Sequence, residues 1–249
     1  MNNIEEIIPS TSQLKIKIFS DGADLDSIAE AYQQKVVSGF TTNPTLMAKA
    51  GVTNYISFAR EMLKIVPDLP VSLEVFCDDF DGMRHQAHVL NSLAPNVYVK
   101  IPVTNTKRES ACPLIRELAA SGIKLNVTAI LSLQQVRDVV GALKPGVPSI
   151  VSVFAGRIAD SGRDPVPLMK QALEITNTVK GAELLWASPR EPLNILQAER
   201  LGCHIITVTP ELLAKSKNFG KSLDDFSLET VKMFYSDAVK SGFKILDND

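Results

Sequence analysis

The chain has 249 residues, of which 45% are hydrophobic and 22% charged, with a formal net charge of −2 and an isoelectric point near 6.0. This balance excludes a disordered chain and a membrane-embedded one, and the lack of a basic block gives no reason to expect a nucleic-acid partner. A chain of this length can form one large α/β barrel as well as two smaller domains.

The N-terminal stretch MNNIEEIIPSTSQ lacks the positive start and long apolar run of a signal peptide. No later stretch reaches the ~18 apolar residues of a membrane span. We therefore expect a cytoplasmic protein with no membrane partner. The cysteines, Cys77, Cys112 and Cys203, are far apart, which indicates neither a disulfide framework nor a zinc site.

Short apolar strands alternate with amphipathic stretches, which predicts repeated βα units and a parallel sheet. The predicted strands are residues 15–21, 38–43, 71–76, 97–103, 124–130, 148–156, 182–188 and 203–208. The predicted helices between them are residues 24–37, 53–66, 80–93, 107–120, 132–143, 164–179 and 189–200. Asp24, Ser132 and Asp164 are candidate helix starts, and Gly122 and Gly202 are candidate left-handed helix ends.

Two further helical stretches, 209–218 and 225–242, follow the eighth strand. We interpret residues 1–249 as a single (β/α)₈ barrel domain with residues 209–249 as a helical C-terminal extension. A doubly wound open sheet is the alternative. A barrel predicts that functional side chains gather at the carboxyl ends of the strands, and most of the predicted strands carry polar residues there.

Lys100 lies in the middle of the apolar stretch VYVKIPV. Alternation along a strand places Tyr98, Lys100 and Pro102 on one face. Because burial disfavours the charged form of an amine, an inward lysine can act as a nucleophile that forms a Schiff base with a ketone. The alternatives are a buried ion pair between Lys100 and Glu74, or a lysine that points outward.

The other strand ends carry groups that suit cleavage of a carbon–carbon bond. Asp21 is the candidate base for the hydroxyl proton, with a helix cap as the alternative. Glu74 and Thr128 are candidates to hold a water that relays protons to the lysine nitrogen, although a salt bridge would also explain Glu74. Asn43 and Asn126 are candidates to hold substrate hydroxyls, and the alternatives are a turn residue and a core amide.

Arg157, Ser188 and Arg190 follow the sixth and seventh predicted strands. Guanidinium groups and a hydroxyl suit a phosphate, and barrels often bind one near their last strands. Solvated surface arginines are the alternative. We also assign Thr42, Ser152 and Phe154, at the same strand ends, to the substrate-binding set.

Seven stretches of the chain resemble the transaldolase family, including its small branch with fructose-6-phosphate aldolase. They are FSDGADL (19–25), GFTTNPTL (39–46), SLEV (72–75), VYVKIPVT (97–104), LNVTAILS (125–132), VSVFAGRIAD (151–160) and ELLWASPRE (183–191). The resemblance implies a barrel that needs no metal or organic cofactor, with Lys100 as the Schiff-base lysine and Asp21 as the acid/base.

The resemblance also implies roles for the remaining residues. Glu74 and Thr128 would surround a catalytic water, and Asn43 and Asn126 would contact the dihydroxyacetone unit. Three residues would take the sugar phosphate: Arg157, Ser188 and Arg190. Small members of the family commonly assemble into rings through C-terminal helices, so we expect a homo-oligomer formed in this way.

Three positions favour a transaldolase over an aldolase within this family. Aldolase members tend to have glutamine where this chain has Glu74 and tyrosine where it has Phe154, and they lack Asn126. The expected function is transfer of a dihydroxyacetone unit from a ketose phosphate to an aldose phosphate. The alternatives are an aldolase that releases free dihydroxyacetone, and a phosphosugar-binding relative without turnover.

Overall fold

The structure is a computed structural model that describes residues 8–245, so the first seven residues, where a signal peptide is not expected, and the last four residues of the predicted extension lie outside it. Residues 15–215 form one compact unit, and the terminal segments on either side form another, which contains helix α11 (Leu223–Ser241). Within the described part of the chain, no helix combines the length and apolar character needed to cross a membrane.

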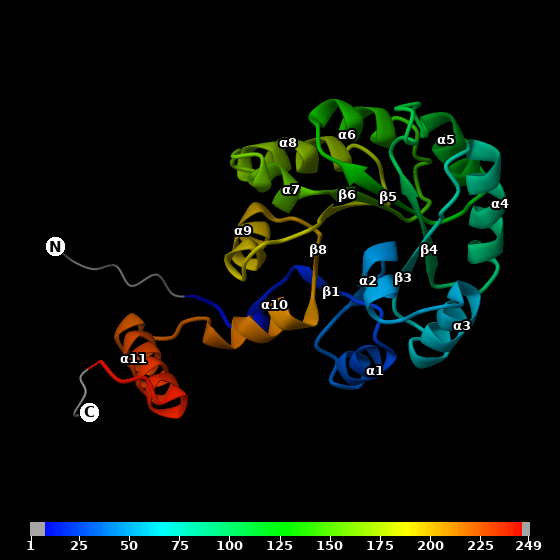
Figure 1. The fold of residues 1–249 in the computed structure, drawn as a ribbon. Helices are drawn as coiled ribbons and strands as arrows, with labels where there is room; N and C mark the ends of the chain where they lie inside the picture. Colours follow the sequence, from blue (N-terminus) through cyan, green and yellow to red (C-terminus); the bar gives the residue numbers. More distant parts are fainter. Residues whose placement is uncertain (1–7, 246–249) are drawn as a thin grey trace. The chain divides into compact units, whose positions relative to one another are not determined.

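Eight parallel strands close into a barrel in chain order, with β8 paired to β1. The strands are β1 (Lys17–Asp21), β2 (Gly39–Thr41), β3 (Val71–Glu74), β4 (Val97–Pro102), β5 (Leu125–Ile130), β6 (Ser149–Val153), β7 (Ala182–Trp186) and β8 (Ile205–Val208). This closure confirms the predicted (β/α)₈ barrel and rules out the open-sheet alternative (Figure 1).

Helices follow the strands and lie outside the barrel (Figure 1). They are α1 (Leu25–Gln33), α2 (Pro44–Lys49), α3 (Tyr55–Ile65), α4 (Phe80–Asn91), α5 (Cys112–Ala120), α6 (Leu133–Val140), α7 (Ala155–Asp160), α8 (Val166–Thr176), α9 (Leu193–Leu201) and α10 (Pro210–Lys215). Helices α1 to α9 each bury apolar side chains, as amphipathic helices do when they cover a barrel, whereas α10 buries none.

The predicted helix boundaries depend on capping residues that the structure confirms. The Asp24 carboxylate accepts a hydrogen bond from the backbone N–H of Ser27 and starts α1. Ser132 starts α6 in a capping box, and the Asp164 carboxylate accepts a bond from the backbone N–H of Val166, the first residue of α8. Gly122 and Gly202 both have φ near +80° and follow the ends of α5 and α9, the conformation that glycine adopts at little cost.

The predicted strand 148–156 is wrong at its C-terminal end. β6 ends at Val153, and residues from Ala155 onward form helix α7. Helices α2 and α7, of six residues each, were both absent from the prediction. A helix this short gives less than two full turns of periodic pattern, so an apolar run such as VFAG cannot be distinguished from the end of a strand.

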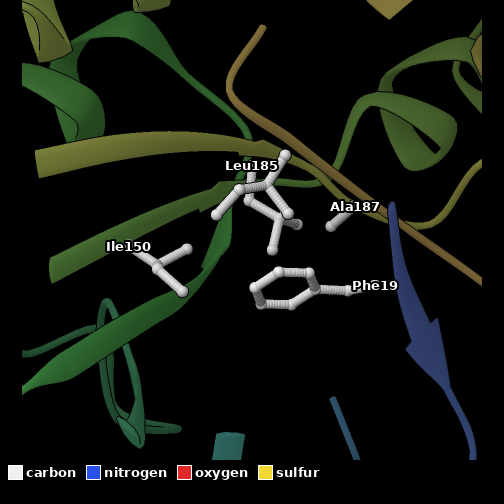
Figure 2. Packing of buried hydrophobic residues seen from close by; sticks show 5 residues of the cluster. Phe19, Ile150, Leu185 and Ala187 are labelled. Carbon is white, nitrogen blue, oxygen red and sulfur yellow. The ribbon is translucent and has the colours of Figure 1, made fainter. Parts of the chain in front are cut away.

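The barrel interior is filled below the strand ends by a cluster of buried apolar side chains. Its members are Phe19, Ile150, Leu185, Ala187 and Ile205. Figure 2 shows the Phe19 ring beside Leu185 and Ile150. The ring fits because Gly39, its register partner on β2, has no side chain: a Cβ there would lie 2.5 Å from the ring edge. This cluster forms the floor beneath the polar residues described next.

Candidate active site

A cavity of about 490 Å³ opens at the carboxyl ends of the strands, directly over the apolar cluster, whose Leu185 and Ala187 contribute to its wall. Most of the predicted site residues line it: Asp21, Asn43, Glu74, Lys100, Asn126, Thr128, Ser152, Phe154, Arg157 and Ser188. The two other predicted residues, Thr42 and Arg190, are not among the described residues that line the cavity. Side chains from well-separated parts of the sequence therefore meet in one place, as the barrel interpretation predicts.

The amine of Lys100 points into the barrel. Its Nζ lies 3.1 Å from Oε2 of Glu74 and donates a hydrogen bond of 2.9 Å to the backbone carbonyl of Thr42. The Lys100 and Glu74 side chains are only 9% and 16% exposed, which rules out the outward-pointing lysine. The ion pair that the sequence left as an alternative is present. A carboxylate at this distance is also a proton acceptor for the amine, so the pair is compatible with a reactive lysine.

The carboxyl group of Asp21 ends β1 inside the barrel. Oδ1 accepts a bond of 2.7 Å from the Thr41 hydroxyl, and Oδ2 lies 3.4 Å from the Asn43 amide. Burial raises the pKa of Asp21 above its ordinary value, although the positive charge of Lys100 and the two hydrogen bonds act to lower it. Because Asp24 caps α1, the capping alternative for Asp21 is ruled out. The group holds its proton to higher pH than an exposed aspartate does.

The two predicted asparagines are held by different partners. Asn43 caps α2 through a 3.0 Å bond from the backbone N–H of Leu46, so it is a turn residue as well as a residue of the cavity wall. Asn126 is fully buried on β5. Its amide donates to the Ser72 hydroxyl at 2.9 Å and accepts from the Ser152 hydroxyl at 2.6 Å. These bonds fix the orientation of the Asn126 amide in the cavity wall.

Thr128 lies on β5 opposite Pro102 of β4 and is almost fully buried. Its hydroxyl oxygen is one of the few buried side-chain atoms that lack a hydrogen-bond partner in the described part of the chain. The strand is irregular here: the register shifts between Val127 and Ile130, and Ala129 has φ +61°. A buried hydroxyl without a protein partner marks a place where a water or a substrate atom can bind.

Arg157 and Arg190 occupy different surroundings. Arg157, on α7, lines the cavity, and its guanidinium carbon lies 5.6 Å from the centre of the Phe154 ring. Arg190 instead pairs with Asp160 at the end of α7, with Nε 2.8 Å from Oδ1, and it donates to the Ser188 hydroxyl at 3.0 Å. Arg190 therefore contacts Ser188, which lines the cavity, but is not itself among the described residues that line it.

The segment that carries Ser188 packs tightly against α7. Ser188 has φ +60°, which is uncommon for a residue with a side chain. A Cβ added at Gly156, in the first turn of α7, would lie 1.6 Å from the carbonyl oxygen of Ser188. Gly156 is therefore required for the close approach that brings Arg157 and Ser188 to the same wall of the cavity.

Sequence reasoning missed Thr41 and Thr207, which both line the cavity. Their hydroxyl oxygens lie 2.6 Å apart, and Thr41 also bonds Asp21. The available signal was alternation: Thr41 and Asn43 share a face of the second strand, and Thr207 is the polar residue near the end of the eighth. In the described part of the chain, no three His, Cys, Asp or Glu side chains are grouped so that they could hold a metal ion.

Comparisons with known proteins agree on one family. A family model described as transaldolase/fructose-6-phosphate aldolase matches residues 18–245. A probable transaldolase from Thermoanaerobacter sp. (strain X514) is 36% identical over 231 residues, which cover 92% of this chain and the whole relative. A probable transaldolase from Syntrophobacter fumaroxidans is 38% identical over 197 residues, 78% of this chain and 85% of the relative.

Solved structures that resemble the chain share its fold at low identity. A dihydrodipicolinate synthase from Rhodopseudomonas palustris superposes with a TM-score of 0.53 at 12% identity, over 86% of this chain and 77% of the other. A 2,3-dimethylmalate lyase gives a TM-score of 0.55 at 12% identity, over 96% and 88%. At such identities the likeness concerns the barrel alone.

Proposed function

Because the chain belongs to the transaldolase/fructose-6-phosphate aldolase family, we propose that it is a transaldolase. It moves a dihydroxyacetone unit from a ketose phosphate, such as fructose 6-phosphate or sedoheptulose 7-phosphate, to an aldose phosphate. The observation that carries the proposal is the buried amine of Lys100, which lies 3.1 Å from Glu74 and shares a cavity with Asp21. A lysine, a proton acceptor for it and a second acid/base group are the parts that a Schiff-base mechanism needs.

The first step joins Lys100 to the substrate ketone. Glu74 takes a proton from the amine, and the bond from Nζ to the Thr42 carbonyl fixes the direction of attack. The nitrogen adds to the carbonyl carbon and gives a carbinolamine. Loss of its hydroxyl group as water then gives an iminium, and a water held by Glu74 and the unpartnered Thr128 hydroxyl carries the protons.

The second step cleaves the bond between C3 and C4 of the sugar. Asp21 takes the proton of the C4 hydroxyl, the C3–C4 electron pair moves toward the iminium, and an aldehyde leaves. The remaining enamine adds to a new aldehyde while Asp21 returns the proton, and water then releases the product from Lys100. The raised pKa of Asp21 suits a group that must both accept and return a proton.

Substrate binding is assigned to the polar walls of the cavity. Asn43, Asn126 and Ser152 face the dihydroxyacetone unit, near Lys100. Arg157, held against Phe154, is the guanidinium group for the phosphate, together with the Ser188 hydroxyl that Arg190 supports. Sugar phosphates of this size place the reaction in carbohydrate metabolism, and we propose the cytoplasmic pentose phosphate pathway as its setting.

Borohydride trapping tests the assignment. Incubation with fructose 6-phosphate and borohydride should reduce the iminium to a stable amine, and peptide mapping should find the added mass on Lys100 alone. A Lys100→Met variant serves as the control and should show neither the adduct nor turnover. An adduct on another lysine, or full turnover in the Lys100→Met protein, would reject the mechanism.

The same assays separate the alternatives. With fructose 6-phosphate alone, a transaldolase holds its dihydroxyacetone unit on the enzyme, and the unit is released only onto an acceptor aldehyde. Steady accumulation of free dihydroxyacetone without an acceptor would instead identify an aldolase. Thermal stabilisation by sugar phosphates with neither an adduct nor exchange would identify a binding protein without turnover.

A further inference from the structure

A line of hydroxyl groups leads from the wall of the barrel to Asp21. Thr207 lies on β8 and Thr41 on β2, and these two strands flank β1, which ends with Asp21. The Thr207 and Thr41 oxygens are 2.6 Å apart, and the Thr41 oxygen is 2.7 Å from Oδ1 of Asp21. Thr207 and Thr41 are 6% and 3% exposed, so water competes little for either bond.

The number of protons that each group can donate determines the direction of the hydrogen bonds along this line. A threonine hydroxyl has one proton to donate, whereas an ionised carboxylate only accepts. When Asp21 is ionised, the Thr41 proton is used in the bond to Oδ1. The short contact between the threonines therefore requires the Thr207 hydroxyl to donate to Thr41. Hydrogen bonds connected in this way polarise one another, so the outer bond strengthens the inner one.

We propose that Thr207 is a positioning residue for Asp21: it donates to Thr41 and keeps the Thr41 hydroxyl turned toward Oδ1. Without Thr207, the Thr41 hydroxyl can rotate toward another acceptor. With Thr207 in place, Oδ1 is held by the 2.7 Å bond from Thr41. Oδ2 accepts only a long bond of 3.4 Å from the Asn43 amide, so it is the oxygen available to the substrate hydroxyl. The catalytic meaning of this arrangement rests on the proposed function, but the coupling of Thr207 to Asp21 does not.

A purely structural role would also explain two bonded hydroxyls in a barrel wall, so the test must detect the effect on Asp21. Three charged side chains line the same cavity as Asp21: Lys100 of β4, its partner Glu74 of β3, and Arg157 of α7. Asp21 also lines a second cavity, whose other charged lining residues are Asp24, Lys49 and Glu211. None of these groups is altered when Thr207 is changed, so a shift in the titration of Asp21 reports the hydroxyl line.

The direct measurement is the titration of the Asp21 carboxyl carbon by NMR in the intact protein, with an Asp21→Asn spectrum to assign the signal. Thr207→Val, which keeps the shape and removes the hydroxyl, should raise the midpoint by about 0.3–0.5 pH unit, as expected for loss of cooperative support of one bond. Thr207→Ser should restore the original midpoint. If Thr207→Val does not fold, Thr207→Ala carries the same expectation, since it introduces no new atom.

Two further variants make the result specific. Thr176→Val removes another buried hydroxyl, one that bonds a carbonyl within α8, and it should leave the Asp21 midpoint unchanged. In a Thr41→Val background the line is already broken, so Thr207→Val should add no further shift. An unchanged midpoint in Thr207→Val, or an equal shift with and without Thr41, would overturn the proposal.

Kinetics then separate this inference from the proposed function. If Asp21 is the base, activity is lost as the pH falls through its pKa, so the acidic limb of kcat/KM should move upward in Thr207→Val by the same amount as the NMR midpoint. A shifted midpoint in a protein that shows no transaldolase activity would reject the proposed function and leave the coupling of Thr207 to Asp21 intact.

Discussion

The surroundings of Lys100 are compatible both with a structural ion pair and with a reactive amine. Its amine is paired with the Glu74 carboxylate, which by itself would describe a structural ion pair. The pair nevertheless lies in the wall of a cavity of about 490 Å³, and the amine also donates a hydrogen bond to the backbone carbonyl of Thr42. A buried pair with open space beside it can exchange a proton and then admit a substrate, whereas a pair within a packed core cannot.

The unpartnered hydroxyl of Thr128 leads to a prediction at the same scale. Thr128→Val removes an oxygen that bonds no described residue, so the free energy of unfolding should stay the same or rise slightly. If the hydroxyl holds the catalytic water, kcat should fall by about 10–100-fold, within the range for loss of assistance to proton transfer. Denaturant unfolding and steady-state exchange assays on the same sample measure the two effects.

Thr176→Val is the matched control, because Thr176 is equally buried but its hydroxyl donates to the carbonyl of Ala172. This variant should lose about 1 kcal/mol of stability and keep its kcat. Full activity in a folded Thr128→Val protein would contradict a role for that hydroxyl.

At the scale of elements, the site depends on the packing of short segments that follow the strands. Helix α7 carries Arg157 and Asp160, and the segment after β7 carries Ser188 and Arg190. The ion pair between Asp160 and Arg190 joins the two segments at their exposed ends. Gly156 allows the backbone of α7 to approach the carbonyl oxygen of Ser188 closely. The positions of Arg157 and Ser188, the proposed phosphate-binding groups, therefore depend on this contact.

Gly156→Ala should disturb that contact directly. The new Cβ would lie 1.6 Å from the Ser188 carbonyl oxygen, so one of the two backbones must move. We expect a loss of about 1–3 kcal/mol of stability, typical of overpacking. KM for phosphorylated sugars should rise more than KM for the unphosphorylated ketose. Thermal melts and kinetics with both substrates check this.

Gly141→Ala, after α6 and away from the cavity, provides the comparison, since its new Cβ meets no atom closer than 3.2 Å. A Gly156→Ala protein that matches Gly141→Ala in stability and in both KM values would show that the close approach is not needed.

At the scale of the whole molecule, helix α11 stands out because its apolar side chains are exposed. Phe226, Val231, Met233, Phe234 and Tyr235 are all at least 42% exposed, as are several others along the helix. A helix that presents this much apolar surface is typical of one that packs against a partner. We propose that the partner is another copy of the chain, in keeping with the homo-oligomer that the family resemblance implies.

Phe234→Asp should therefore weaken self-association. In the proposed oligomer the Phe234 ring would be buried between copies, so a charge in its place should raise the dissociation constant by at least about 30-fold, the effect of losing a central aromatic contact. Light scattering during size-exclusion chromatography, repeated over a range of concentrations, measures the mass. Lys232→Glu changes an exposed charged position on the same helix and serves as the control. An unchanged mass in Phe234→Asp would contradict the proposal.

The sequence by itself determined the fold and most of the site. Alternating strand and helix patterns placed eight strands, and the barrel interpretation grouped Lys100, Glu74 and Asn126, which the structure pairs in register on three neighbouring strands. The capping residues Asp24 and Ser132 were also predictable, since capping depends on contacts within a few residues of the chain. Such local rules hold wherever the segment lies in space.

Only the tertiary structure decided which side chains touch. Helix α7 could not be predicted, because a segment of six residues is too short to show a helical period. The ion pair between Asp160 and Arg190 joins residues 30 positions apart in the sequence. The line of hydroxyl groups from Thr207 through Thr41 to Asp21 joins residues more than 100 positions apart. Such contacts depend on the register and closure of the barrel, which bring β8 beside β1. No pattern within a single segment contains that information, because the distance between two side chains is set by every strand between them.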